Sequence, residues 1–384
     1  MLKIDPQDEL ICLRAHDAQA GGPALPPIAQ ASLFRQPSME RLLVGLSRED
    51  DHFIYSRGSN PTVAILEKTL AELERGEACK CFASGMGAIS AVLFGLLEAG
   101  DHVLFVNDIY GPTIELAERL SRFGVDYSRT FATAAHEIVA AIRDQTRIIY
   151  IESPGSTLFG LAPIEAICNA AKLRGIVTVM DNTVATPLLQ KPLSFGVDLV
   201  VHSCSKYIGG HSDVVGGAVV GSAALLHTIF YESYMLLGAA MAPFDAWLLL
   251  RGLMTLPARM QRHHADGLEI ASFLQAHPRI ERLFHPAFCE SQSDLMNRQM
   301  LGHSGLFSVC VDVPDFSGLL TVANRLQLFG KAVSWGGAES LVMTGHKSDP
   351  GKNPSARVPM NLLRLSVGLE GADNLIRDLE RALA

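Results

Sequence analysis

The sequence lacks the features that direct a chain to nucleic acid or to a membrane surface. It has 32 Lys plus Arg against 40 Asp plus Glu, a formal net charge of −8, and no run of basic residues. Proteins that bind phosphate backbones or anionic lipid normally present a basic patch. We therefore expect neither nucleic acid nor a membrane among the partners of this chain.

Long apolar runs and targeting signals are missing as well. The longest apolar stretch of the first half, residues 89–97, is too short to cross a bilayer. Residues 1–20 contain four acidic side chains and no long apolar core, unlike a signal or transit peptide. The sequence therefore predicts a protein without a membrane span.

The seven cysteines do not form a recognisable framework, because they are odd in number and scattered over 384 residues. This usage favours a reducing compartment, and we expect a cytoplasmic protein. Cys79 and Cys81 lack the two-residue gap of zinc motifs, and His263 and His264 are adjacent, so they point to different faces of a helix. We expect no metal site.

What the sequence does contain is a globular composition, with 48% hydrophobic and 19% charged residues. From residue 101 short apolar strands alternate with amphipathic helices, a pattern typical of right-handed βαβ units and a mostly parallel, helix-covered α/β sheet. After about residue 242 the pattern becomes mixed α+β. The predicted organisation is an irregular N-terminal arm, a large domain and a smaller C-terminal domain: residues 1–56, 57–242 and 243–384.

The most informative stretch begins with a buried strand near residues 197–201 and continues to Lys206. Open α/β sheets place their ligands at the carboxyl ends of such strands. An amine there is partly desolvated, which lowers its pKa and suits it to Schiff-base chemistry. Ser203 and Ser205 add two hydroxyl groups that suit a phosphate. The alternative is that Lys206 is an ordinary exposed loop lysine.

Residues 203–217, SCSKYIGGHSDVVGG, resemble the cofactor-lysine segment of the pyridoxal-phosphate enzymes of cysteine and methionine metabolism. The resemblance extends from about residue 26 to about residue 370. It implies a fold-type I architecture, pyridoxal 5'-phosphate carried by Lys206, and a small sulfur amino acid as substrate. It also implies a homo-oligomer in which catalytic dimers pair into a tetramer.

A phosphate-binding turn is expected where the apolar run at residues 78–84 meets a glycine-containing segment. A helix is predicted to begin at Ala88, so backbone N–H groups and a positive helix end would face a phosphate. The third glycine of a dinucleotide fingerprint is replaced by Ser90, which argues against a nucleotide-binding oxidoreductase. The resemblance implies that Gly85 and Met86 belong to the phosphate site.

Tyr55 and Arg57 lie in YSRGSNPT, which resembles the family segment whose tyrosine and arginine reach the cofactor phosphate of a neighbouring subunit. The planar guanidinium fork of arginine pairs two phosphate oxygens. By the same resemblance Tyr55 of the neighbour keeps Lys206 neutral before reaction. On local evidence alone both side chains are ordinary turn residues.

Asp181 and Tyr110 follow predicted strands, and so does Glu152. Asp181 could be a helix cap. The resemblance instead implies a salt bridge from Asp181 to the protonated pyridine nitrogen of the cofactor. It also implies that the ring of Tyr110 stacks on the cofactor and takes part in catalysis. The alternative for Tyr110 is a half-buried core tyrosine.

Arg364 lies inside an apolar strand, where a charge is costly unless it is paired. One interpretation is a structural ion pair with Asp181 or another carboxylate. The resemblance implies that Arg364 binds the α-carboxylate of the substrate, assisted by the backbone at Ser334, with Trp335 beside it. The role of the polar loop at residues 346–359 stays open.

The reaction depends on smaller features. Residues 152–156, ESPGS, and Trp335 resemble cystathionine β-lyases, whereas residues 60–62 and 182–190 resemble the γ-acting branch equally well. Pro112 replaces a cysteine of methionine γ-lyases. The resemblance therefore favours a carbon–sulfur lyase that converts L-cystathionine to homocysteine, pyruvate and ammonia.

The alternatives are a γ-acting relative and a non-catalytic regulatory protein on the same fold. The γ-acting relatives are cystathionine γ-synthase, cystathionine γ-lyase and O-acyl-homoserine sulfhydrylase.

Overall fold

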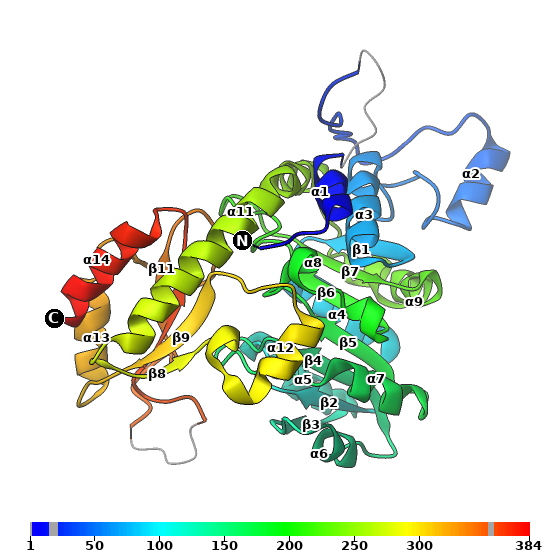
Figure 1. Ribbon diagram of the computed structural model, residues 1–384. Coiled ribbons are helices and arrows are strands. Elements are labelled where there is room, and N and C mark those ends of the chain that lie inside the picture. Colours follow the sequence, from blue (N-terminus) through cyan, green and yellow to red (C-terminus); the bar gives the residue numbers. More distant parts are fainter. Residues whose placement is uncertain (1, 15–21, 352–356) are drawn as a thin grey trace.

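A computed structural model describes residues 2–14, 22–351 and 357–384, and two β-sheets organise it (Figure 1). The first sheet has seven strands in the order β1-β7-β6-β5-β4-β2-β3. Its strands are β1 (Ala78–Phe82), β2 (His102–Val106), β3 (Asp126–Thr130), β4 (Thr146–Glu152), β5 (Val177–Asp181), β6 (Leu199–Ser203) and β7 (Gly217–Gly221). Strands β2 to β6 are parallel to one another, and β7 is antiparallel to both of its neighbours. The predicted mostly parallel α/β sheet is confirmed.

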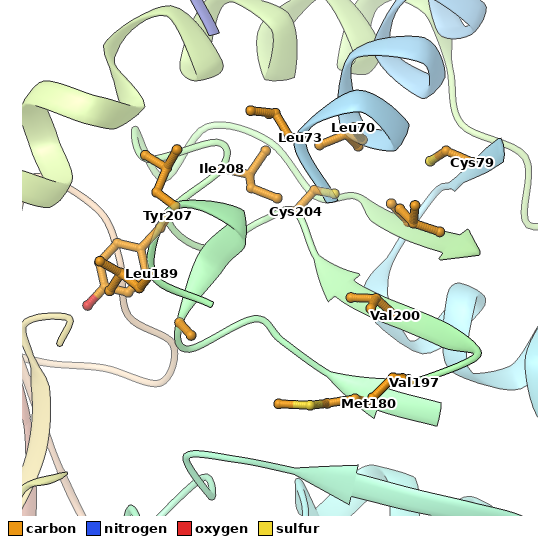
Figure 2. Close-up of a cluster of buried hydrophobic side chains, with 14 of the residues drawn as sticks. Leu70, Leu73, Cys79, Met180, Leu189, Val197, Val200, Cys204, Tyr207 and Ile208 are labelled. Atoms are coloured by element: carbon orange, nitrogen blue, oxygen red, sulfur yellow. The ribbon is translucent and has the colours of Figure 1, made fainter. Parts of the chain in front are cut away.

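Helices cover both faces of this sheet. Successive residues of its central strands point to opposite faces and accordingly belong to different hydrophobic clusters. Ile149 and Ile151 belong to one cluster, and Ile148 and Tyr150 belong to the other. Such two-sided burial explains why these strands are almost uniformly apolar. Figure 2 shows part of the first cluster, which includes Met180 and Val200 of the sheet and Leu70 and Leu73 of the helix α3 (Pro61–Glu74).

The helices and short 3-10 and π-helical turns have the following bounds: α1 (Pro6–Leu13), α2 (Met39–Leu46), α3 (Pro61–Glu74), α4 (Gly85–Leu96), α5 (Gly111–Leu120), η1 (Ser121–Phe123), α6 (Ala135–Ala140), α7 (Ile164–Lys172), α8 (Thr186–Leu189), η2 (Pro192–Phe195), α9 (Ala223–Ile229), η3 (Phe230–Tyr234), α10 (Met235–Leu237), α11 (Pro243–Ala276), η4 (Pro286–Phe288), η5 (Glu290–Gln292), α12 (Ser293–Gln299), α13 (Phe316–Arg325) and α14 (Ala372–Leu383).

The second sheet has five strands in the order β10-β11-β12-β9-β8, antiparallel except for the pair β10 and β11. These strands are β8 (Ile280–Phe284), β9 (Leu306–Val311), β10 (Gly330–Lys331), β11 (Leu341–Thr344) and β12 (Leu362–Ser366). The 34-residue helix α11 packs its first half into the core of the large sheet and its second half against the small one (Figure 1). The predicted limits of the arm and the two domains stay predictions.

Three helices differ from the expectations drawn from the sequence. Helix α4 begins at Gly85 rather than at Ala88, because the Ser84 hydroxyl accepts a hydrogen bond from the backbone N–H of Gly87 at 3.0 Å and caps it earlier. Helix α6 ends at Ala140, whereas the sequence pattern predicts a helix over residues 137–144, and α13 ends at Arg325, whereas the pattern predicts residues 316–329.

The supposedly irregular arm contains α1 and α2. Helix α1 is tied to its own chain because Asp8, which is buried, pairs with Arg75 and Lys191 at 2.8 Å each.

In the described part of the chain, no helix combines the length and apolarity needed to traverse a bilayer. The same residues contain no group of three or more His, Cys, Asp or Glu side chains arranged to hold a metal ion.

Three histidines meet where α11 contacts the segments around β8 and α12. The ring centroid of His303 lies 4.8 Å from that of His264 and 4.9 Å from that of His285. Burial, aided by the charges of the other two rings, lowers the pKa of His285 to about 3. Burial also lowers the pKa of His303 to about 4. The imidazole rings of this cluster are therefore neutral in the folded protein.

This cluster predicts acid sensitivity. The ordinary histidine pKa is 6.5. Below that pH these histidines become protonated in the unfolded chain but stay neutral in the folded chain. The free energy of unfolding therefore falls as the pH falls. At pH 5 each buried ring should cost up to about 2 kcal/mol. We expect urea unfolding to show a large loss of stability between pH 7 and pH 5.

Two variants test the assignment of this loss. In His285→Asn the difference between the two pH values should shrink, whereas in His227→Gln, which changes an exposed histidine, it should match the parent protein. An unchanged difference in His285→Asn would exclude the cluster as the cause.

Candidate active site

Polar side chains gather at the carboxyl ends of the central strands β4, β5 and β6. Glu152 ends β4 and pairs in register with Asp181 at the end of β5, while Ser203 ends β6. The alternation along each strand places all three on the face that carries α4. The α4 helix approaches closely: a Cβ on Gly85 would lie 2.9 Å from the Cβ of Ser203. The sheet edge and the start of a helix therefore meet at one place.

Lys206 lies three residues beyond β6, and its amine is enclosed. Its Nζ donates a hydrogen bond to the Ser334 hydroxyl at 2.6 Å and lies 5.6 Å from the ring centroid of Trp335. Burial lowers the pKa of Lys206 to about 8, and the positive charge of Arg364 lowers it further, while Asp181 opposes the shift. The neutral amine is therefore far more accessible near neutral pH than in an ordinary lysine, as the sequence predicted.

Ser334 reaches this amine from an unusual backbone conformation. Its φ of 84° lies in the left-handed region, which costs energy for a residue with a Cβ. The next but one residue, Gly336, approaches so closely that a Cβ there would lie 2.8 Å from the backbone nitrogen of Tyr207. The loop before β11 is thus fitted against the lysine segment.

Asp181 is buried, and its partners are hydroxyl and backbone groups. The backbone N–H of Thr183 donates to its Oδ1 at 3.0 Å, and the Thr183 hydroxyl donates to the same oxygen. Among the described residues, no lysine, arginine or histidine forms an ion pair with it. Burial raises the pKa of Asp181. A buried carboxylate without a cation suits a ligand that brings a positive ring nitrogen.

Glu152 fixes the position of Tyr110. The backbone N–H of Tyr110 donates to Glu152 Oε2 at 2.8 Å, and the Ser156 hydroxyl donates to Oε1. Burial, followed by the nearby charge of Asp181, raises the pKa of Glu152 well above its usual value. The Tyr110 side chain is 46% exposed. The ring is therefore not packed into the hydrophobic core, as the alternative interpretation would require.

Arg364 lies in β12 with its guanidinium turned toward the same edge. It donates to the backbone oxygen of Ser156 at 3.4 Å and contacts the sulfur of Met343 at 3.0 Å. Within the described ranges no carboxylate lies at ion-pair distance, so the alternative of a structural ion pair with Asp181 is wrong. Burial lowers its pKa, with Glu152 opposing. An unpaired, largely buried guanidinium is suited to bind a carboxylate.

The four residues expected around a phosphate behave differently. Gly85 is the first residue of α4, and the Ser203 side chain lies beside it. Ser205 is already engaged, because its hydroxyl accepts from the backbone N–H of Gly216 at 3.0 Å. Met86 is half-buried against the apolar cluster of that face. Geometry thus favours the helix start and Ser203 over the Ser205 hydroxyl.

Tyr55 and Arg57 lie apart from this group. The Arg57 guanidinium is 5.7 Å from the Tyr55 ring centroid, and both line an open depression whose other wall includes residues 240–243. In the part of the chain that the structure describes, neither hydrogen-bonds to Lys206 or Asp181. An action across a subunit interface, which the sequence suggested, stays a prediction.

Two contributors were not singled out from the sequence. Thr183 donates its hydroxyl to Asp181 and accepts from the backbone N–H of Ser203 at 2.9 Å, which joins the ends of β5 and β6. Asn107 has a φ of 81° directly after β2, and its amide donates to the backbone oxygen of Glu152 at 2.8 Å. The sequence offered one signal for these two contributors, because each is a polar residue just after a predicted strand.

These features define a site that combines a reactive amine, a carboxylate for a ring nitrogen and a guanidinium for a carboxylate, the requirements of a pyridoxal-phosphate enzyme. The model of the Cys/Met metabolism PLP-dependent enzyme family matches residues 10–384, and the chain belongs to this family. The expected cofactor, pyridoxal phosphate, is therefore confirmed.

Three curated relatives illustrate the similarity. L-methionine gamma-lyase of Pseudomonas putida is 38% identical, covering 99% of this chain and 94% of the relative. Cystathionine gamma-lyase of Bacillus subtilis is 36% identical, covering 93% of each. Cystathionine gamma-synthase of Mycobacterium leprae is 38% identical, covering 93% of this chain and 91% of the relative. All three names refer to the γ position, so these relatives support the γ-acting alternative rather than the expected β-lyase.

Two solved structures share the whole fold. The crystal structure of metB from Corynebacterium glutamicum is similar with a TM-score of 0.90 and 32% identity, covering 99% of both chains. The structure of a putative O-acetylhomoserine (thiol)-lyase (metY) from Campylobacter jejuni has a TM-score of 0.91 and 30% identity, covering 98% of this chain and 99% of that chain. The latter carries N'-pyridoxyl-lysine-5'-monophosphate at its position 205.

The environment of Lys206 predicts its reactivity. In protein freed of cofactor, the rate of trinitrophenylation at Lys206, followed by peptide mass spectrometry, should rise with a midpoint near pH 8. The variant Arg364→Gln should move this midpoint upward, because the neighbouring positive charge is removed. A midpoint at the ordinary lysine value of 10.5 would contradict the described burial.

Proposed function

We propose that the chain is a pyridoxal-phosphate-dependent carbon–sulfur lyase that cleaves L-cystathionine by β-elimination to homocysteine, pyruvate and ammonia. The observation that carries this proposal is the enclosed amine of Lys206, held by Ser334 against Trp335 and close enough to Arg364 for its pKa to fall. An amine in this state can both accept and return a proton.

The residues present fit the cofactor. Lys206 would carry it, Asp181 would pair with its ring nitrogen, and the exposed ring of Tyr110 would stack on it. The start of α4 with Ser203 would receive the phosphate. When bound, pyridoxal phosphate supplies an electron sink for negative charge at the substrate Cα.

The chain's own groups would then orient the substrate and move its proton. Arg364 would hold the α-carboxylate, since it lacks an acidic partner among the described residues and a guanidinium binds a carboxylate in a fork. Lys206, as a free amine, would accept the Cα proton at Nζ. The same Nζ would donate a proton to the sulfur as the carbon–sulfur bond breaks, so no second base is required.

Two site features support cleavage at the β position. Trp335 and Ser156 belong to the motifs that resemble β-lyases, and both contact the proposed machinery. Trp335 lies against Lys206 and packs 5.3 Å from the ring centroid of Tyr207. Ser156 donates to Glu152 and accepts from Arg364.

The second candidate is a γ-acting enzyme, which the three relatives named above favour. Cleavage at the γ position needs a further proton transfer at Cβ, for which Lys206 or Tyr110 would be the available group. Both candidates use the same cofactor and the same carboxylate site, so they differ in product.

The exposed apolar side chains of the arm support a homo-oligomer. Large hydrophobic side chains gather in residues 33–53 and are exposed in the single chain: Leu33, Met39, Leu43, Val44, Leu46 and Phe53. A second copy of the chain would cover them, and Tyr55 and Arg57 would then be available to a neighbouring site.

The product from L-cystathionine separates the two candidates. We expect pyruvate and homocysteine, and Lys206→Ala should abolish turnover because the amine is removed. The variant Trp335→Leu should retain the visible absorption of bound cofactor but lose at least about tenfold in kcat/KM, since the packing around the amine changes. Formation of 2-oxobutyrate with cysteine would instead establish the γ-acting candidate, and the absence of both keto acids would refute a cystathionine lyase.

A further inference from the structure

The ring of Phe131 carries two guanidinium groups. The Cζ atom of Arg357 lies 3.8 Å from the ring centroid, and that of Arg129 lies 4.9 Å from it. Phe131 directly follows β3, and Arg129 is the next to last residue of that strand. Arginine stacks on an aromatic ring through its planar face, which leaves its N–H donors directed sideways. The Phe131 ring therefore holds two guanidinium groups close together, with their N–H donors at the edges of the stack.

This group lies on the same sheet edge as the active site. The backbone N–H of Asn107 donates to the backbone oxygen of Thr130 at 2.9 Å, so the ends of β2 and β3 are side by side. Asp108 follows, and its backbone oxygen accepts from the N–H of Ser156 at 2.9 Å. Ser156 in turn accepts from Arg364. A short continuous path thus leads from the stacked arginines to the proposed carboxylate site.

In the described ranges, neither Arg129 nor Arg357 has a hydrogen bond or an ion pair with an acidic side chain. Arg357 does feel the charge of Asp108, but both Asp108 carboxylate contacts run from a single oxygen to the backbone N–H groups of Thr157 and Leu158, at 2.8 and 3.2 Å. Both arginines are exposed, and their like charges repel each other, so an anion bound between them would relieve the repulsion.

The segment that carries Arg357 is anchored over this edge rather than lying free on the surface. His346 Nε2 lies 2.9 Å from the backbone oxygen of Val358, which ties the two ends of the loop together. Lys347 pairs with Glu115 of α5 at 3.6 Å, one turn beyond Tyr110. The described parts of the loop therefore extend from the start of α5 to Phe131.

We propose that Arg129 and Arg357, stacked on Phe131, form a subsite for a second carboxylate at the far end of the substrate. This inference rests on the proposed function, in which Arg364 holds the α-carboxylate. It assigns the substrate class: a sulfur amino acid whose leaving part ends in a carboxylate, as in cystathionine, is preferred over one with a neutral end, as in methionine.

Binding of two unreactive amino acids to the pyridoxal-phosphate-loaded enzyme tests this subsite. L-2-aminopimelate ends in a carboxylate, and L-2-aminoheptanoate has a methyl group in its place, while both share the α-carboxylate. Isothermal titration calorimetry should give a Kd about tenfold lower for L-2-aminopimelate, the strength typical of a charge-assisted hydrogen bond. The variants Arg129→Gln and Arg357→Gln should each reduce this ratio toward one and leave the Kd of L-2-aminoheptanoate unchanged.

Arg122→Gln is the matched control. The substitution removes the same charge from η1. Because η1 precedes β3, it lies at the amino end of that strand, away from the proposed subsite. The preference for L-2-aminopimelate should therefore persist in Arg122→Gln. Equal affinities in the parent enzyme, a preference that survives in both test variants, or an equal loss in Arg122→Gln would overturn the subsite.

Neither ligand needs to be cleaved. If L-cystathionine is not a substrate, the binding ratio still decides the subsite, and failure of the proposed function is told apart from failure of this inference.

Discussion

The site depends on buried charges that are kept from neutralising one another. Asp181 and Glu152 end adjacent strands, and the charge of Arg364 is close enough to Lys206 to help lower its pKa. None of these four forms an ion pair with another among the described residues. Burial of unpaired charge is expensive, so the fold must provide the compensating interactions. These groups remain available for a cofactor with a cationic ring nitrogen and an aldehyde, and for the carboxylate of a substrate.

Backbone and hydroxyl hydrogen bonds keep the charges apart. Thr183 satisfies one Asp181 oxygen and joins it to the end of β6, Ser334 holds the amine of Lys206, and Ser156 connects Glu152 to Arg364. The parallel sheet brings the carboxyl ends of its strands together. Helix α11 packs against both sheets and so fixes the position of β12 relative to the large sheet. The catalytic geometry is therefore a consequence of how the two sheets are joined.

Local patterns in the sequence predicted much of this arrangement. The apolar runs before Asp181 and Lys206 predicted two buried strands, with these residues at or just beyond the carboxyl ends. Arg364 was recognisable as a charged residue inside an apolar strand. The sequence could not show that Ser334 would reach Lys206, because that contact spans 128 positions and depends on a left-handed backbone conformation. The start of α4 was misplaced for a local reason, since the cap at Ser84 outweighed the glycines that suggested a turn.

The hydrogen bond between Ser205 and Gly216 and the pairing of Asp8 in α1 with Arg75 and Lys191 are tertiary contacts and likewise could not be predicted. The choice between β- and γ-cleavage is the other point at which local motifs and overall similarity diverge. Motifs around Ser156 and Trp335 resemble β-lyases, whereas the relatives described above carry γ-acting names. The choice between the two reactions depends on a few side chains near the amine, and these are a small part of the 384 residues of the chain.

The central claim is that the amine of Lys206 carries the cofactor. Its most direct test is reduction of the pyridoxal-phosphate-loaded protein with borohydride, followed by peptide mass mapping. The account predicts a single pyridoxyl-phosphate adduct on Lys206. An adduct on another lysine, or no stable adduct, would contradict it.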